Sequence, residues 1–317
     1  MIVAQGLAKH FGTLAAVDGV SLNVATGEVL GFLGPNGAGK TTTMRMLAGF
    51  LEPSAGSASI DGFDVVHRPL EARRRLGYLP EGAPLYGDMS VVGFLRFVAE
   101  VRGFHGAEKA RRIDRVVDLV SLATVVDRPV ETLSKGFKRR VGLAQSMLHD
   151  PPVLVLDEPT DGLDPNQKHH VRTLIRSMAK DKAIIVSTHI LEEVDAVCSR
   201  AVVIADGRIV ADGTADELLT RLPTHNTVSA TVPAGVAAAA RAALAPLAAG
   251  RLGETAGDGG QVVFYVPAEA GVSRLARVSD ALDRAGIAPS ALIVERGRLE
   301  DAFRVLTTPT AAGRAGR

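Results

Sequence analysis

The chain has 317 residues, of which 46% are hydrophobic and 22% charged, an ordinary globular composition with room for one large domain or two smaller ones. Its 36 basic and 35 acidic residues form no long block of one sign, so bulk electrostatics gives no support for binding to nucleic acid or to a membrane surface. The single cysteine, Cys198, excludes an internal disulfide and any zinc or iron–sulfur site built from several cysteines.

Hydropathy predicts neither a targeting segment nor a membrane-spanning helix. No uncharged apolar run reaches the roughly 18 residues that suggest a spanning helix. The N-terminus shows no basic segment followed by an apolar one, which a signal peptide would have. We therefore expect the chain itself to stay in the cytoplasm, a compartment that also suits a lone cysteine.

Short apolar strands alternate with helical patterns in the first part of the chain, which predicts an α/β fold with a largely parallel sheet flanked by helices. The clearest strands are residues 28–34, 152–158 and 183–189. Each is apolar almost throughout, as strands covered on both faces are, whereas a one-sided sheet would alternate. We therefore expect these strands at the centre of the sheet.

Between about residues 88 and 150 the pattern becomes helical. Apolar residues at 137, 141, 144 and 148 share one helix face, and the helix ends before two prolines at 151–152. This region is predicted to be a helical subdomain inserted in the first domain.

A change of composition near residues 220–227 predicts a boundary between a domain of residues 1–222 and a smaller one of residues 226–306. The expected order in the second domain is strand, helix, strand, strand, helix, strand, which matches a small ferredoxin-like α+β plan. Its predicted elements are strands at 227–232, near 252, at 261–266 and at 291–295, an alanine-rich helix, a helix at 272–285 and a last helix at 299–306. The tail, residues 307–317, is predicted to be disordered.

The segment GPNGAGKT, from Gly34 to Thr41, directly follows an apolar strand and opens a helix, which is the context of a phosphate-binding loop. Its glycines let backbone N–H groups surround the β-phosphate, Lys40 reaches the β- and γ-phosphates, and the Thr41 hydroxyl ligates Mg²⁺. The alternative, an unrelated glycine turn, is disfavoured by this context. The predicted nucleotide-binding residues here are Gly34, Pro35, Asn36, Gly37, Ala38, Gly39, Lys40, Thr41 and Thr42.

A second candidate site is the segment VLVLDEP, in which an apolar strand delivers two carboxylates at its C-terminal end. Open α/β sheets bind ligands at that edge. Asp157 would hold the metal and Glu158 would polarise an attacking water, because positioning and charge stabilisation supply most of the rate in phosphoryl transfer. Taken alone, the pair could equally be ordinary loop acids.

Together these motifs resemble the ATP-binding subunit of an ABC transporter, over roughly residues 2–220. The family's signature motif matches LSKGF at 133–137, its D-loop matches DGLD at 161–164, and its switch histidine matches His189. The resemblance implies a P-loop ABC ATPase core that uses ATP and Mg²⁺. It assigns His189 to the γ-phosphate and the attacking water and places Asp164 at the nucleotide, although an isolated histidine is usually structural.

Other matches are looser. Phe11 stands where the family stacks an aromatic ring on adenine, and a core phenylalanine is the alternative. Glu81 occupies the place of the Q-loop glutamine, where a carboxylate can still ligate Mg²⁺ but cannot donate an amide hydrogen bond. Phe137 replaces the signature glutamine and Asp161 a small D-loop residue. Some exporter members share the Pro-Glu pair and an added C-terminal domain, so the chain is most similar to that branch.

The signature segment also poses an electrostatic question, because residues 138–140 and Lys135 bring cations to a helix N-terminus that is already positive. Ser134 can cap this helix and Gly136 allows close backbone approach, so free N–H groups there would form an anion site. We expect residues 138–140 themselves to face solvent or a partner.

The resemblance implies that each ATP lies between the phosphate loop of one subunit and the signature of another, in a twofold pair. The expected partners are a second copy of this chain and separate transmembrane permease subunits, with no nucleic acid. The protein would then lie on the inner face of the cell membrane and drive export.

The alternative is a soluble ABC-type ATPase that acts on ribosomes or DNA. The chain has neither the second such domain nor the long coiled coils typical of those proteins. A GTPase is disfavoured because no Asn-Lys-x-Asp segment is present.

Overall fold

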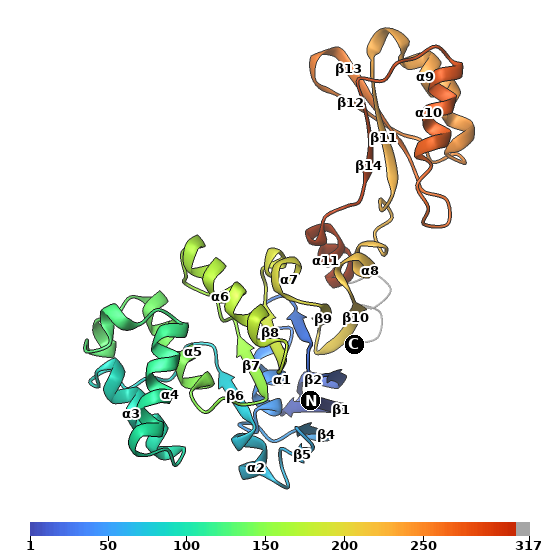
Figure 1. Ribbon diagram of the computed structural model, residues 1–317. Helices are drawn as coiled ribbons and strands as arrows, with labels where there is room; N and C mark the ends of the chain where they lie inside the picture. Colours follow the sequence, from blue (N-terminus) through green and yellow to red (C-terminus); the bar gives the residue numbers. More distant parts are fainter. Residues whose placement is uncertain (309–317) are drawn as a thin grey trace. The chain divides into compact units, whose positions relative to one another are not determined.

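A computed structural model of the protein describes residues 1–308 and contains two compact units, Met1–Thr214 and a second unit that begins at Ala215 (Figure 1). The division falls eight residues before the predicted boundary at 222. Of the tail predicted to be disordered, residues 309–317 lie outside the described part of the chain.

The centre of the first unit is a six-stranded sheet in the order β10-β9-β3-β8-β7-β6. Its strands are parallel except for β10, which pairs with β9 in the antiparallel sense. The three strands predicted to be central are confirmed as β3, β7 and β8, and each is buried along its whole length. The strand bounds are β3 (Val29–Leu33), β6 (Leu76–Leu79), β7 (Val153–Asp157), β8 (Ala183–Thr188), β9 (Arg200–Ala205) and β10 (Arg208–Gly213).

A second sheet makes the unit mixed rather than mostly parallel, which corrects the prediction. Its order is β2-β1-β4-β5, and every pairing is antiparallel. The strands are β1 (Ile2–Phe11), β2 (Leu14–Val24), β4 (Ala55–Ile60) and β5 (Phe63–Asp64). The ladder between β1 and β2 shifts register between Ala4 and Leu7, where Gly6 has a φ of 58°. Such a bulge breaks the two-residue alternation by which an exposed strand is recognised in a sequence.

Helices cover the central sheet and build the inserted subdomain. Three of them, α3 (Val91–Val101), α4 (Gly106–Leu119) and α5 (Lys135–Met147), occupy the span predicted to be helical. Val141, Ala144 and Leu148 are buried in one hydrophobic cluster with the sheet residues Leu154 and Leu156, as their spacing predicts. The remaining helices of the unit are α1 (Lys40–Leu47), α2 (Pro69–Arg74), α6 (Pro165–Met178) and α7 (Leu191–Val197).

The second unit contains a four-stranded antiparallel sheet in the order β12-β13-β11-β14. Its core joins Phe264 of the sheet to Val278 and Leu282 of a helix. The elements are α8 (Ala215–Leu219), β11 (Thr227–Pro233), α9 (Ala237–Leu244), β12 (Gly253–Ala256), β13 (Gln261–Val266), α10 (Leu275–Arg284), β14 (Ala291–Glu295) and α11 (Leu299–Thr307). Helix α10 starts three residues later than predicted, because Val272 pairs with Glu269 in an isolated bridge.

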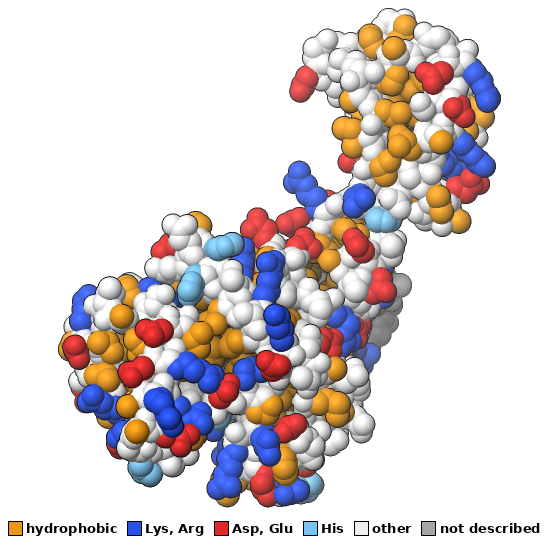
Figure 2. Space-filling view, in the orientation of Figure 1, with side chains coloured by type: hydrophobic (Ala, Val, Ile, Leu, Met, Phe, Trp, Pro, Cys, Tyr) orange, Lys and Arg blue, Asp and Glu red, His pale blue; other side chains and the backbone are white. Residues whose placement is uncertain are grey.

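No helix among residues 1–308 has the length and apolar character needed to cross a bilayer. On the face of the first unit seen in Figure 2, basic and acidic side chains are interspersed rather than gathered by sign. This surface offers no continuous basic stripe of the kind that follows a nucleic-acid backbone.

A half-buried histidine that follows α5 in the chain predicts acid sensitivity of the first unit. His149 shares a hydrogen bond of 3.0 Å with the Leu76 carbonyl through Nε2, and burial lowers its pKa from 6.5 to about 4. Between pH 4 and pH 6.5 the unfolded chain therefore binds more protons than the folded chain. The contribution of His149 to the free energy of unfolding is fully present above pH 6.5 and is lost as the pH drops toward 4. The loss attributable to this residue is on the order of 3 kcal/mol.

Replacing this histidine tests that expectation. The substitution His149→Gln keeps an N–H donor for Leu76 and removes the titration, so we expect a smaller loss of stability between pH 6.5 and 4 than in the wild type. Urea unfolding followed by circular dichroism measures it, with the exposed His169→Gln as control. Equal acid losses in wild type and His149→Gln would contradict the assignment.

Candidate functional site

The glycine loop lies between the end of β3 and the start of α1, in the predicted strand, loop and helix order. A Cβ on Gly34 would lie 2.5 Å from the Ile204 carbonyl oxygen, and one on Gly39 would lie 2.5 Å from the Ala16 carbonyl oxygen. Gly39 also has a φ of 103°, so only glycine fits at the helix start. Since α1 has no side-chain cap and no acidic residue in its first turn, its first N–H groups are available to an anion.

The Lys40 side chain lies along this loop. It is 7% exposed, and its Nζ donates to the Gly34 and Pro35 carbonyl oxygens at 2.7 and 3.2 Å. Burial lowers the pKa of Lys40, and the charges of Glu158, Asp157 and Glu81 oppose that shift. The ammonium group is thus held by neutral carbonyls beside a group of carboxylates.

Predicted residues from four separate segments line one cavity of about 370 Å³. The segments are the glycine loop with the start of α1, and the single residues that follow Pro80, β7 and β8. The lining residues are Ala16, Asn36, Gly37, Gly39, Lys40, Thr41, Thr42, Glu81, Glu158 and His189. Ala16, in β2, was not predicted, because nothing in its local sequence marks it. Gly34, Pro35 and Ala38 belong to the loop but do not line the cavity.

Asp157 lies at the buried end of β7 and is 1% exposed. Its Oδ1 accepts a hydrogen bond from the Ser187 hydroxyl, and its Oδ2 is buried with no partner in the described structure. An unpartnered buried carboxylate oxygen is costly unless something else binds it, and a hard cation would do so. Ser187 was not predicted, although a serine within the apolar run of β8 is a usable signal.

Glu158 and His189 contact each other directly, with 2.9 Å between Oε1 and Nδ1. The side chains are 15% and 51% exposed. Glu158 has a φ of 51°, a left-handed conformation that costs a non-glycine residue on the order of 1 kcal/mol or more. Its N–H donates to the carbonyl and hydroxyl oxygens of Ser187, which helps to hold this conformation.

Glu193 is a buried acid that the sequence did not reveal. It is 3% exposed and accepts hydrogen bonds from the hydroxyls of Thr160 and Thr188, the latter at 2.8 Å. Arg172 lies 3.7 Å away. Glu193 therefore joins the segment after Glu158 to the residue before His189, although in sequence it is one of two adjacent glutamates on α7.

Besides Asp157 and the three loop residues, four further predicted residues do not line the cavity. Phe11 is 50% exposed with the Lys9 ammonium 5.5 Å from its ring centre, so the core alternative is wrong. Ser134 caps α5 as predicted, accepting from the Phe137 N–H at 3.4 Å. Asp164 caps α6, accepting from the Gln167 N–H at 2.9 Å. Gly136 is the fourth residue, and a Cβ there would lie 2.8 Å from the Gln167 side chain.

The expectation that residues 138–140 face solvent or a partner is wrong for two of the three. Arg139 and Arg140 are 6% and 8% exposed, and Lys138 is half-buried. Both guanidinium groups donate to backbone carbonyls, which replace water as their hydrogen-bond partners. Lys135 pairs instead with Asp161 at 2.8 Å on the surface, where an ion pair contributes about 0–1 kcal/mol.

A glycine loop between a buried parallel strand and a helix start, with acids at the carboxyl end of a neighbouring strand, defines a P-loop nucleotide-binding protein. The family model described as ABC transporter matches residues 17–161. The chain belongs to the ABC transporter family, as one of its ATP-binding proteins.

Two relatives give the extent of the similarity. The chain is 39% identical over 219 residues to the probable multidrug ABC transporter ATP-binding protein YbhF of Escherichia coli, which covers 69% of this chain and only 38% of YbhF. It is 39% identical over 221 residues to the Nod factor export ATP-binding protein I of Ralstonia nicotianae, which covers 69% of both chains.

Solved structures of ABC transporter ATP-binding proteins are also similar to this chain. A structure described as the ATP-binding subunit of an ABC transporter aligns with a TM-score of 0.64 at 31% identity, over 69% of this chain and 91% of that one. The dimeric ABC transporter cassette MJ0796 aligns with a TM-score of 0.63 at 22% identity, over 68% of this chain and 98% of that one, and shows the shared fold.

Proposed function

We propose that the chain is the ATP-hydrolysing subunit of an ABC exporter and works as a head-to-tail dimer beneath separate permease subunits. The observation that carries this proposal is the cavity that joins the glycine loop to Glu81, Glu158 and His189. The names of the two relatives, a probable multidrug transporter protein and a Nod factor export protein, support export as the direction. The protein would then lie at the inner face of the membrane.

ATP with Mg²⁺ fits the residues of the site. The free N–H groups at the start of α1 and the Lys40 ammonium suit a triphosphate. The orphaned Oδ2 of Asp157 suits a magnesium ion, with the Thr41 hydroxyl and Glu81 as further oxygen ligands. When bound, the ion would neutralise charge on the phosphates. Among residues 1–308, no three His, Cys, Asp or Glu side chains form a group that could hold a metal ion, so much of the coordination would come from phosphate and water oxygens.

Glu158 and His189 are the proposed catalytic pair. The Glu158 carboxylate lines the cavity and lies 2.9 Å from His189 Nδ1, so the imidazole can orient it. In that position Glu158 would polarise the attacking water, and His189 would contact the γ-phosphate. Phe11, exposed at the end of β1, offers an open aromatic face to adenine.

A second copy of the chain would complete the site. Ser134, Gly136 and Asp164 lie outside the cavity, so a phosphate held by Lys40 is not enclosed by the N-terminus of α5 in the same chain. The exposed Ser134 and the first turn of α5 would meet the γ-phosphate of the partner's ATP. A twofold axis satisfies both sites at once.

The C-terminal part is proposed to be an accessory domain of the ferredoxin-like plan, with the ATP-binding domain ending near residue 222. The strand order β12-β13-β11-β14, with one helix after β11 and another after β13, supports this plan.

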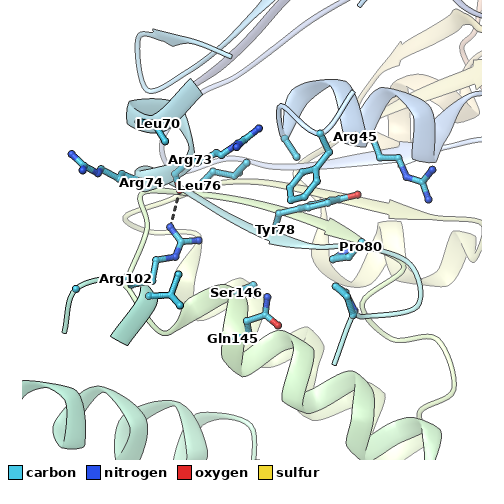
Figure 3. Close-up of a pocket in the computed structure, with 15 residues that line it drawn as sticks. Arg45, Leu70, Arg73, Arg74, Leu76, Tyr78, Pro80, Arg102, Gln145 and Ser146 are labelled. Carbon is cyan, nitrogen blue, oxygen red and sulfur yellow. Dashed lines mark hydrogen bonds between the residues drawn. The ribbon is translucent and has the colours of Figure 1, made fainter. Parts of the chain in front are cut away.

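A cleft of about 740 Å³ on the first unit is the proposed docking site for the permease (Figure 3). Phe50, Leu70 and Val101 contribute apolar side chains that are 65–70% exposed. Arginines from α1, α2 and the end of α3 surround them, and Figure 3 shows Arg102 hydrogen-bonded to the Arg73 carbonyl. The full lining is Arg45, Ala48, Phe50, Leu70, Arg73, Arg74, Leu76, Tyr78, Pro80, Pro84, Val101, Arg102, Gly103, Gln145 and Ser146.

The chemistry of the cleft indicates its occupant. Exposed apolar side chains close to several arginines suit a short permease segment that has apolar and acidic side chains. Pro80, at one end of the cleft, directly precedes Glu81 of the nucleotide cavity. A permease segment docked in the cleft would therefore be only one peptide bond, between Pro80 and Glu81, away from the residues that line the nucleotide cavity.

Replacing Phe50 tests the docking site and, with it, the transporter role. We expect Phe50→Asp to leave the ATPase rate of the isolated protein unchanged. We expect it to weaken retention of the protein on membranes that contain the permease about tenfold or more, because the complex would lose an aromatic side chain that docking buries. Quantitative sedimentation with such membranes measures this retention.

The control is Val272→Asp, in the second unit, because Val272 is 68% exposed and Phe50 is 69% exposed. Retention of Phe50→Asp at the wild-type level would contradict the proposal that the cleft docks the permease. If the wild-type protein sedimented with polysomes instead of membranes, the ribosomal alternative would be favoured.

A further inference from the structure

The buried guanidinium of Arg139 joins three segments of the first unit. Its Nη1 donates to the Pro80 carbonyl at 2.7 Å, and its Nε and Nη2 both donate to the Glu158 carbonyl, at 3.1 and 2.6 Å. The Nη2 group also donates to the Asp157 carbonyl. One side chain of α5 therefore binds the chain just beyond the ends of two adjacent parallel strands, β6 and β7.

These contacts bear on the conformation of Glu158. A left-handed residue keeps its conformation only when its surroundings hold it there. The Ser187 oxygens accept from the Glu158 N–H, and the Glu158 carbonyl accepts from the Asp161 N–H and from Arg139. Because φ sets the direction of the side chain, these bonds also place the carboxylate that contacts His189.

The shape of the guanidinium matters as much as its charge. Arginine presents five N–H donors in a rigid planar fork, whereas lysine presents a compact head on a flexible stem. A lysine at 139 could keep a positive charge near Asp157, Glu158, Asp161 and Glu81, but it could not hold carbonyls of both strand ends in one plane.

We propose that Arg139 is a positioning residue that fixes the backbone of Glu158 and ties it to the Pro80–Glu81 segment. The inference rests on the proposed function, in which Glu158 polarises the attacking water. It gives the signature helix a role within its own chain, separate from the contact between its first turn and the partner's nucleotide.

Steady-state kinetics of Arg139→Lys tests the proposal. We expect kcat to fall about 10- to 100-fold, because small misplacements of a catalytic group have effects of that size, while the KM for ATP changes by less than about threefold. Rates are divided by the fraction of protein that binds a fluorescent ATP analogue, so unfolded material does not count. Arg139→Gln is the second variant, and we expect the same loss of kcat.

The neighbouring Arg140→Lys is the matched control. Arg140 is as buried as Arg139, but it donates to the Val120 and Ser121 carbonyls inside the helical subdomain and stacks on Phe137 at 4.1 Å. We expect this variant to lower the thermal midpoint while its corrected kcat stays within about threefold of the wild type. A purely structural role of Arg139 would make the two variants behave alike and would overturn the proposal.

A double-mutant cycle shows whether Arg139 acts through Glu158. In a Glu158→Gln background, Arg139→Lys should cause no further loss of rate, because the group it positions is already disabled. Independent losses, or a wild-type kcat for both Arg139 variants, would overturn the inference. Full activity of Glu158→Gln alone would instead remove the proposed function, so the two failures are distinguishable.

Discussion

Replacing Glu158 by glutamine is expected to lower the rate of ATP hydrolysis at least about a hundredfold while ATP still binds. Glutamine has nearly the same shape, but it cannot accept a proton or carry the negative charge that polarises water. The Glu158 side chain lines the nucleotide cavity and contacts His189 at 2.9 Å, so the change acts where the chemistry is proposed to occur.

The same variant should remain dimeric in the presence of ATP and Mg²⁺, because hydrolysis is the step that releases the two copies. Phosphate release and analytical ultracentrifugation with and without ATP measure the two effects. Glu192→Gln, which makes the same change at an exposed position of α7, should behave as the wild type. Rapid hydrolysis by Glu158→Gln would exclude Glu158 from the catalytic role.

Mixing two inactive variants should restore activity if each site is shared between chains. Lys40→Ala disables the glycine loop of its own chain, and Ser134→Arg blocks the first turn of α5. A mixed dimer then contains one site with both defects and one intact site. Random pairing at equal concentrations makes about half of the dimers mixed, so independent sites predict about a quarter of the wild-type rate.

The assay is steady-state ATP hydrolysis at a fixed total concentration of protein. Each variant alone should be inactive, and the rate of the mixture should rise and pass through a maximum as the ratio is varied around one to one. A mixture no more active than its components would contradict a site composed of two chains. An active Ser134→Arg monomer would contradict it more directly.

The local motifs were determined by the sequence, because their geometry depends on residues that are close in the chain. The stretch from Gly34 to Thr41 follows β3 and opens α1 as predicted, since the backbone at Gly39 excludes any side chain. The apolar run before Asp157 ends at the carboxyl edge of a buried strand for the same local reason. The central strands and the capping of α5 by Ser134 follow equally from short patterns.

The tertiary structure decided which residues far apart in the sequence lie together, because no short segment of sequence contains that information. Glu81 and His189 lie 108 positions apart in the sequence, at the ends of different strands, and only the sheet order brings them into one cavity. The bulged β1 and β2 escaped prediction because a register shift disturbs the alternation that marks an exposed strand.

Arg139 shows most clearly why the burial of a charged side chain could not be predicted from the sequence. Four charged residues within six positions predict a solvated helix face, yet Arg139 and Arg140 are buried. A cation leaves water only where other groups accept its hydrogen bonds, and for Arg139 those acceptors are the carbonyls of Pro80, Asp157 and Glu158. The sequence alone determined that these cations exist and lie on one helix, whereas long-range packing determined which of them meet water.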